Sequence, residues 1–222
     1  MLWFNVCKFR NLGCDPVRAI IVGAGIAGLS AALRLGQAGW ETLIVERAPR
    51  RRGGGYLVAF GGIGLTGAER MGVLDQLRAH AHQPSEMTYY DVAGNRRFAV
   101  GGDVIAATLG TTFNILRRDI ESVLFRAVRD RTEIRFGTTV SAITQDDQGV
   151  HAVLSDGTHA EADLLIGADG LHSSVRSMMF GPEQDYAHDL KHKVAVYMLP
   201  ERPSGLGEHA GAASMATAGC SP

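Results

Sequence analysis

A short apolar run followed by three spaced glycines constrains this chain more than any other feature. The run is Ala19 to Val22, and its β-branched residues are typical of a strand that is buried on both faces. Gly23, Gly25 and Gly28 follow it at the spacing G-x-G-x-x-G. Glycines at this spacing allow a tight turn, a close approach of the backbone to a pyrophosphate, and close packing of a helix on the strand.

The segment after the glycines completes the pattern. Ile26 to Ala38 has helical composition, and Thr42 to Val45 is a second predicted strand. Glu46 ends that strand 18 positions after Gly28 (46 − 28). An acidic residue at about this offset binds a ribose hydroxyl in dinucleotide-binding folds, and the helix N-terminus offers N–H groups to a pyrophosphate. We therefore interpret residues 18–47 as a dinucleotide-binding unit, the alternative being a glycine-rich turn in an ordinary α/β domain.

Composition argues against several classes of function. The 222 residues carry a formal net charge of −1, which gives no electrostatic case for nucleic acid or an anionic membrane as a partner. The longest apolar stretch, Ala19 to Leu33, is too short and too glycine-rich for a membrane span. Residues 1–16 lack the pattern of a signal peptide and are expected to be an extension. Cys7, Cys14 and Cys220 form no disulfide framework, which favours a reduced, cytoplasmic protein.

The rest of the chain alternates strand and helix patterns. Strands are predicted at residues 56–60, 86–91, 96–100, 111–116, 133–136, 140–144, 150–154, 158–162, 164–166 and 194–199, and helices at residues 64–71, 73–80 and 118–129. Turn residues separate the three strands from 140 to 162, so these strands are expected to form a β-meander. The basic run at Arg50, Arg51 and Arg52 is either a solvated loop or an anion contact.

A glycine-flanked aspartate, Asp169, follows the predicted strand at residues 164–166. Ligands of open α/β sheets bind outside the C-terminal ends of the strands, so Asp169 is expected to reach the same ligand as Glu46. We interpret Ser173 as a structural or capping hydroxyl rather than as half of a hydrolase pair with His172.

Other candidate groups are better explained by structure. The pairs His80 with His82 and His188 with His192 lack Cys or carboxylate partners at zinc-like spacing, so no metal site is predicted. The aromatic residues Tyr89, Tyr90 and Phe98 could line a pocket, but at strand spacing they are more typical of a core.

Four features together resemble a known family. They are the glycine turn with Glu46-Arg47, the segment Arg117-x-Asp119-Ile120, the meander, and the run Asp163-x-x-x-Gly167-Ala168-Asp169-Gly170-x-x-Ser173-x-x-Arg176. The combination resembles the FAD-dependent aromatic hydroxylases, the para-hydroxybenzoate hydroxylase-like class A flavoprotein monooxygenases, from Val17 to Leu199. The stretch GGGYLVAFGGIGLTGAERMGVLD further resembles the branch that includes the tetracycline-inactivating monooxygenases.

The resemblance implies a fold and a division of the chain. The expected fold is α/β, with a Rossmann-like FAD-binding domain that carries the β-meander, made of residues 17–84 and 110–182. A partial mixed β-sheet substrate domain is expected from residues 85–109 and 183–202. Residues 203–222 have little apolar bulk and are expected to be a disordered tail. The family's later Gly-Asp motif does not occur in the sequence, so the chain is expected to be C-terminally truncated.

The resemblance also implies residue roles. The glycine turn would hold the FAD pyrophosphate, Glu46 the adenosine ribose, and Arg47 would lie near the adenine. Arg117 would contact the flavin side of FAD, Asp169 belongs to a motif that serves both FAD and the nicotinamide coenzyme, and Asp163 and Arg176 would brace that motif. Relatives of the branch often carry an acid where this chain has Ala59. The full expected cofactor-binding set is Gly23, Ala24, Gly25, Ile26, Ala27, Gly28, Glu46, Arg47, Arg117, Val140, Asp169 and Gly170.

The activity implied by the resemblance is that of an FAD-dependent NAD(P)H monooxygenase. In such enzymes NADH or NADPH reduces FAD, the reduced flavin takes up O₂ as a hydroperoxide, and the terminal oxygen hydroxylates a small aromatic or polycyclic substrate. The cofactor carries the chemistry, so no catalytic side chain and no metal is implied. Two alternatives stay open: a truncated, inactive remnant that binds FAD or another nucleotide, and a flavin-dependent reductase or epoxidase on the same fold.

Overall fold

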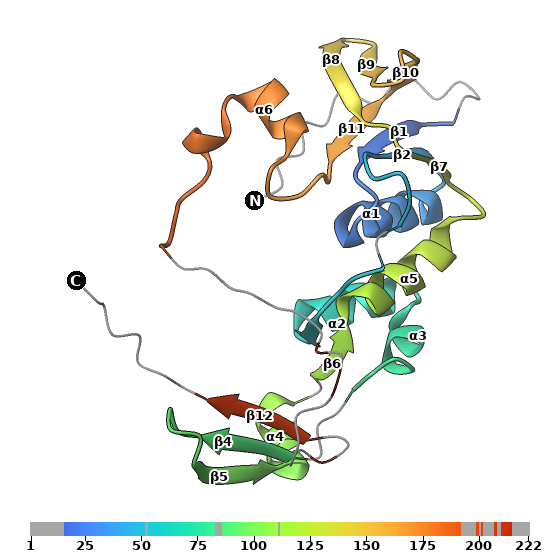
Figure 1. Cartoon of the computed structure of the whole chain (residues 1–222). Coiled ribbons are helices and arrows are strands. Elements are labelled where there is room, and N and C mark those ends of the chain that lie inside the picture. Colours follow the sequence, from blue (N-terminus) through green and yellow to red (C-terminus); the bar gives the residue numbers. More distant parts are fainter. Residues whose placement is uncertain are drawn as a thin grey trace. The chain divides into compact units, whose positions relative to one another are not determined.

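The computed structural model describes residues 16–51, 53–82, 86–110, 112–191, 199, 201, 207 and 210–214. They fall into two units, the first within Met1–Gly54 and Ile120–Val194 and the second within Gly55–Asp119 and Ala195–Pro222 (Figure 1). The ranges 55–84 and 110–119, which the sequence analysis assigned to the cofactor domain, fall within the second unit. The assignment of the chain to a cofactor domain and a substrate domain stays a prediction.

The first unit is built on a parallel sheet. Its order is β11-β1-β2-β7, and each neighbouring pair is parallel. The strands are β1 (Arg18–Val22), β2 (Glu41–Glu46), β7 (Glu133–Phe136) and β11 (Leu164–Gly167), and the associated helices are α1 (Ile26–Gln37) and α5 (Arg117–Val128) (Figure 1). The first three residues of α5 belong to the second unit. The chain passes from β1 to β2 on one side and returns at β11 on the other, so the strand order reverses at β1.

Strand β1 is buried on both faces, as its composition predicts. Ile20 and Val22 pack in a core with Val45 of the neighbouring strand. Ile21 points the other way, because its Cγ2 atom lies 3.3 Å from the position that a Cβ at Gly28 of α1 would occupy. Alternate side chains of one strand therefore anchor two layers of the unit.

The predicted β-meander is confirmed. It consists of the antiparallel strands β8 (Val140–Asp146), β9 (Gly149–Leu154) and β10 (His159–Ala162). Its core residues Val140, Ala152 and Leu154 pack against β1 and against Val175 of α6 (Ser174–Phe180). A short 3₁₀ turn, η1 (Glu183–Asp185), follows α6.

The second unit contains two antiparallel pairings and short helices. In the first, β3 (Leu57–Phe60) pairs with β6 (Phe113–Leu116); in the second, β4 (Glu86–Tyr90) pairs with β5 (Arg96–Gly101). The helices are α2 (Ile63–Arg70), α3 (Leu74–Arg78) and α4 (Gly102–Leu109), of which the sequence analysis did not predict α4. The Tyr89 and Phe98 rings stack with centroids 4.6 Å apart, but Phe98 is 55% exposed and is no core residue.

The expectation of a disordered tail is wrong for one segment. Strand β12 (Ala210–Ser214) pairs in parallel with β4, with Ala212 opposite Thr88. A sheet edge offers backbone hydrogen bonds that need no apolar bulk from the added strand. Small residues also suit this edge, because a Cβ at Gly211 would stand 2.8 Å from the Met87 sulfur. Apart from Gly207, the rest of the predicted tail lies outside the described residues. So do residues 1–15 of the extension predicted at 1–16 and residues 194–198 of the strand predicted at 194–199.

Candidate functional site

Two loops meet at the C-terminal ends of β1 and β11, where the strand order reverses. Gly23 directly follows β1 with a φ of 108°, and its N–H donates to the Val45 carbonyl at 2.7 Å. A Cβ at Gly23 would stand 2.5 Å from the Ala168 carbonyl oxygen and 3.1 Å from the Asp169 Cα. The glycine turn and the Asp169 loop therefore lie against each other, as the sequence analysis expected. In open α/β sheets, this reversal of strand order is where ligands bind.

The N-terminus of α1 opens onto this point without a cap. Its N-cap is Gly25, no side chain caps the helix, and no acidic residue occurs in the first turn. The first helical hydrogen bond runs from the Leu29 N–H to the Gly25 carbonyl at 2.9 Å. Helix geometry leaves the N–H groups of Ile26, Ala27 and Gly28 without carbonyl partners in the helix. With the positive end of the helix dipole, they form a site for an anion.

Glycine serves different purposes at Gly28 and at Gly25. A Cβ at Gly28 would overlap the Gly23 carbonyl oxygen, so only glycine lets α1 pack this closely on the turn. A Cβ at Gly25 would meet nothing within 4 Å, so open space lies in front of the helix at that position. Close packing at one glycine and open space at another are what the dinucleotide-binding interpretation requires.

Glu46 holds the turn and retains acceptor capacity. Its Oε2 atom accepts from the Ala24 N–H and its Oε1 atom from the Ala48 N–H, both at 2.8 Å. Ala24 belongs to the expected cofactor-binding set, but its N–H is occupied by the Glu46 side chain. A carboxylate has about four acceptor sites, so ribose hydroxyls can bind beside these two N–H groups.

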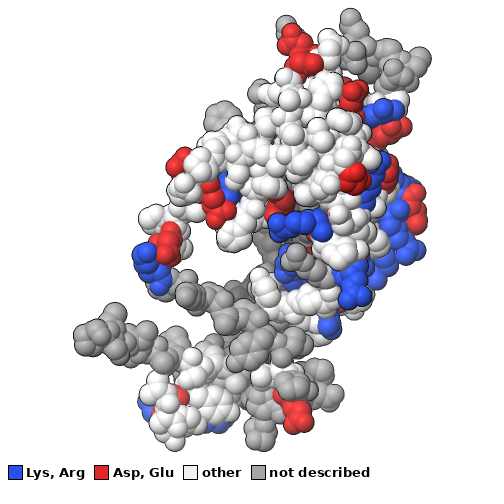
Figure 2. All heavy atoms as spheres, turned by 45° about the horizontal axis from the view of Figure 1, so that its top comes forward, with Lys and Arg blue, Asp and Glu red and all other residues white. Residues whose placement is uncertain are grey.

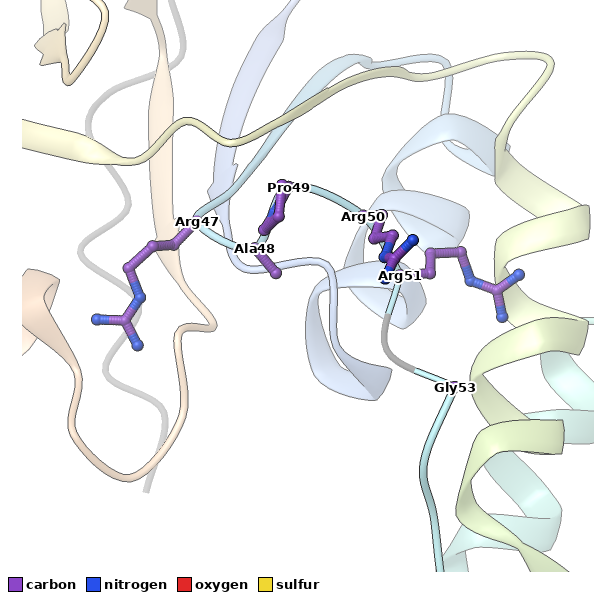
Figure 3. Close-up of a pocket in the computed structure, with 6 residues that line it drawn as sticks. All are labelled: Arg47, Ala48, Pro49, Arg50, Arg51 and Gly53. Carbon is purple, nitrogen blue, oxygen red and sulfur yellow. The ribbon is translucent and has the colours of Figure 1, made fainter.

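The loop after Glu46 forms a basic hollow. Its lining residues are Arg47, Ala48, Pro49, Arg50, Arg51 and Gly53 (Figure 3). Arg47 and Arg51 extend in opposite directions from the loop (Figure 3). Arg51 donates to the Ser122 hydroxyl at 2.7 Å and lies 4.5 Å from the Phe125 ring centroid, so it ties the loop to α5. Arg52 lies outside the described residues. On the face shown in Figure 2, basic and acidic side chains occur side by side.

Asp169 caps α6 with its carboxylate. Oδ1 accepts from the Ser173 hydroxyl, and Oδ2 accepts from the N–H and hydroxyl of Ser174 at 2.7 and 2.9 Å. Oδ2 also accepts from the Val175 N–H at 3.2 Å. The Ser173 oxygen in turn accepts from the Arg176 N–H at 3.0 Å, which confirms Ser173 as a capping hydroxyl.

The hydrogen bonds to Asp169 keep it ionised. Partial burial raises the pKa of its carboxyl, but the hydrogen bonds from the Ser173 hydroxyl, the Val175 N–H and the Ser174 hydroxyl together outweigh burial and lower the pKa below its ordinary value. Because α6 engages this carboxylate, the loop presents the backbone of Ala168 and Asp169 toward the glycine turn.

Of the two residues expected to brace this loop, Arg176 does so and Asp163 does not. Arg176 donates to the Leu171 carbonyl at 2.9 Å and to Glu183 at 3.1 Å, so it does support the loop. Asp163 instead accepts from the Arg18 N–H at 2.8 Å, at the start of β1. Sequence reasoning missed Glu183, because it lies in η1, beyond the end of α6, and its offset from Arg176 matches no recognisable spacing.

Comparison with known proteins identifies the family to which the chain belongs. A family model described as an FAD binding domain matches residues 16–189. The chain belongs to this FAD-binding family of class A flavin monooxygenases. The family resemblance read from the motifs is thereby confirmed, and so is the α/β, Rossmann-like fold class.

The relatives of this FAD-binding domain are longer proteins. Flavin-dependent monooxygenase eupH of Phoma sp is 35% identical over 193 residues, which are 82% of this chain and 44% of the relative. An uncharacterized protein of Mycobacterium tuberculosis is 33% identical over 187 residues, which are 82% of this chain and 49% of the relative. The chain thus spans about half the length of the curated relatives it matches.

Solved structures agree with this assignment. The tetracycline destructase Tet(51) superimposes with a TM-score of 0.64 and 31% identity, covering 75% of this chain and 42% of that chain. HpxO of Klebsiella pneumoniae, complexed with FAD and uric acid, gives a TM-score of 0.62 and 27% identity over 72% of this chain and 41% of that chain.

The first unit of the FAD-binding domain fits part of FAD. The uncapped α1 N-terminus, the open space at Gly25 and the spare acceptor sites of Glu46 suit a pyrophosphate joined to a ribose. Two expected residues fit less directly. Val140 is 2% exposed and packs in the core, so its contact with the cofactor stays a prediction. Arg117 begins α5 in the second unit, where its N–H donates to the Tyr56 carbonyl at 2.9 Å, and its contact with the flavin stays a prediction.

The described part of the chain contains neither a candidate metal-binding cluster nor a candidate membrane-spanning helix. There, no group of three or more His, Cys, Asp or Glu side chains is arranged to hold a metal ion. In the same part, no helix has the length and apolar composition needed to cross a membrane.

Proposed function

We propose that the protein is an FAD-dependent monooxygenase that uses NADH or NADPH and O₂ to hydroxylate a small aromatic or polycyclic substrate. The uncapped, glycine-bounded N-terminus of α1 beside Glu46, in a chain of this family, carries the proposal. Relatives described as flavin-dependent monooxygenases support the reaction class. A tetracycline destructase and a uric acid complex among similar structures support a small, ring-containing substrate.

The proposal gives each part of the candidate site a role. The N–H groups of Ile26, Ala27 and Gly28 would bind the pyrophosphate, and Glu46 would accept hydrogen bonds from the ribose. Arg47 would lie near the adenine, and the backbone at Asp169 and Gly170 would complete the wall. When bound, FAD supplies the redox chemistry with the nicotinamide coenzyme and O₂, while the protein binds, orients and excludes water. Arg117 on the flavin side and a contact at Val140 complete the proposed set.

A two-stage experiment tests this function. The purified chain is titrated with FAD, and we expect quenching of flavin fluorescence and a stoichiometric flavin absorbance after removal of free cofactor. NADH and NADPH oxidation is then measured with a panel of aromatic and polycyclic compounds, and products are analysed for an oxygen atom from ¹⁸O₂. No bound flavin, even with added FAD, would contradict the proposal at its first stage.

A second function is favoured by one observation. Because the chain spans 44% and 49% of two curated relatives, this part of the protein could bind FAD without turnover. Stoichiometric flavin without substrate-dependent NAD(P)H oxidation, across the whole panel, would support FAD binding alone. Coupled oxidation with a labelled, hydroxylated product would support the monooxygenase.

A further inference from the structure

The loop that carries Asp169 depends on contacts from outside itself. This loop, residues 168–173, joins β11 to α6, and its first residues lie against Gly23. Its middle has little packing of its own, since Gly170 has a φ of 87° and Leu171 is 76% exposed. The Asp169 carboxylate ties the loop to the start of α6, and side chains from later in the chain hold the exposed middle of the loop.

Glu183 of η1 is the point where these side chains converge. Arg176 donates from Nη1 to the Leu171 carbonyl at 2.9 Å and from Nη2 to the Glu183 Oε2 atom at 3.1 Å. His172 Nδ1 lies 2.9 and 3.1 Å from the two carboxylate oxygens of Glu183. One carboxylate thus contacts both a residue of the loop and the arginine that supports the loop.

Arg176 relies on few partners for its orientation. Its Nε atom is buried and has no hydrogen-bond partner within the described residues. The Leu171 carbonyl and Glu183 are therefore what orients the planar guanidinium there. Removal of the Glu183 carboxylate leaves the guanidinium free to rotate, and the Leu171 carbonyl then loses a fixed donor.

We propose that Glu183 is a positioning residue for the cofactor. Through Arg176 and His172 it holds loop 168–173 in the conformation that receives FAD beside Gly23. Glu183 acts through the loop and not by contact with FAD. This inference rests on the proposed FAD-binding function. It extends that function to a residue that lies in neither the glycine turn nor loop 168–173.

The test compares Glu183→Ala with a matched control. Glu133→Ala removes another carboxylate of the first unit, which pairs with Arg135 at 2.7 Å on β7. Hydrogen exchange of the peptide that covers residues 168–173 is measured without FAD, and FAD affinity and dissociation rate are then measured. For Glu183→Ala we expect faster exchange in this peptide and about fivefold weaker FAD binding through faster dissociation. Glu133→Ala should match the wild type in all three measurements.

A conservative variant separates positioning from general stability. Glu183→Gln keeps an amide oxygen that can accept from Arg176 and polar atoms within reach of the His172 ring nitrogen, so it should retain most of the FAD affinity. Wild-type exchange or wild-type FAD dissociation in Glu183→Ala would overturn the proposal. A wild-type chain that does not bind FAD would instead contradict the proposed function, and the exchange measurement would still decide whether Glu183 holds the loop.

Discussion

At the scale of one residue, a substitution of Gly25 should weaken cofactor binding with little effect on folding stability. Its φ of −78° and ψ of −175° suit any L-residue, and a Cβ there would meet no atom within 4 Å. Gly25→Ala should therefore change the free energy of unfolding by no more than about 0.5 kcal/mol. The added methyl enters the space in front of α1, so we expect FAD affinity to fall about tenfold, as measured by fluorescence titration.

Gly36 provides the control on the same helix. A Cβ at this exposed position also meets nothing within 4 Å, but it lies near the far end of α1. Gly36→Ala should stabilise the protein by about 0.5–1 kcal/mol and leave FAD affinity unchanged. An equal loss of FAD affinity in both variants would mean that the methyl at Gly25 does not act at a pyrophosphate site.

Glu46 is predicted to matter for both stability and binding. In Glu46→Gln, an amide N–H₂ group would face the N–H of Ala24 or Ala48, which leaves a donor without an acceptor. We expect a loss of about 1–3 kcal/mol in the free energy of unfolding, measured by urea denaturation, together with weaker FAD binding. Glu41→Gln alters an exposed pair with Arg18, so it should change stability by about 0.5 kcal/mol or less.

At the scale of elements, the capping of α6 predicts a pH dependence. Hydrogen bonds lower the pKa of Asp169 in the folded protein, so its ionised form stabilises the fold above the ordinary carboxyl pKa of about 3.9. This contribution is lost as the pH falls through the lowered pKa. Asp169→Asn should cost about 1–3 kcal/mol at pH 7, and its difference from the wild type should shrink below about pH 4. Urea denaturation across this range measures it; a difference independent of pH would contradict the capping argument.

Elements with strong local patterns were predictable, and those that depend on distant partners were not. The parallel strands and the meander follow from continuous apolar runs and turn residues. Helix α4 was missed because it is short and contains the β-branched residues Val104 and Ile105, which weaken a helical pattern. Its one local helix signal is Asp103 in the first turn. Strand β12 was missed because its stability comes from the edge of β4 rather than from its own residues.

The site was predictable to a similar extent. The glycines and Glu46 were found because their roles require fixed spacings along the chain. The capture of the Ala24 N–H by Glu46 and the link from Glu183 to Leu171 through Arg176 depend on the folded arrangement, so no spacing shows them. Val140 was expected at the cofactor from the sequence, but the folded structure places its side chain in the core.

For the whole molecule, FAD binding predicts a ligand-dependent stability. A ligand at 100 times its Kd stabilises the folded state by about 2.7 kcal/mol. We expect FAD at this excess to raise the thermal midpoint of the chain, and ADP to raise it as well if the first unit binds the adenylate half. Riboflavin lacks the pyrophosphate and adenosine and should give a smaller shift. A shift with riboflavin that equals the shift with FAD would contradict the role given to the α1 N-terminus.

The contact between Gly23 and Ala168 has a consequence for how the site is assembled during synthesis. The βαβ segment emerges early, but the wall that faces it comes from β11 and the turn that follows, much later in the chain. A nascent chain that ends before β11 carries the phosphate-binding fingerprint with one side open to water. Cofactor uptake is therefore expected to wait until the return strand has docked, which would make flavin retention a report on completed folding of the parallel sheet.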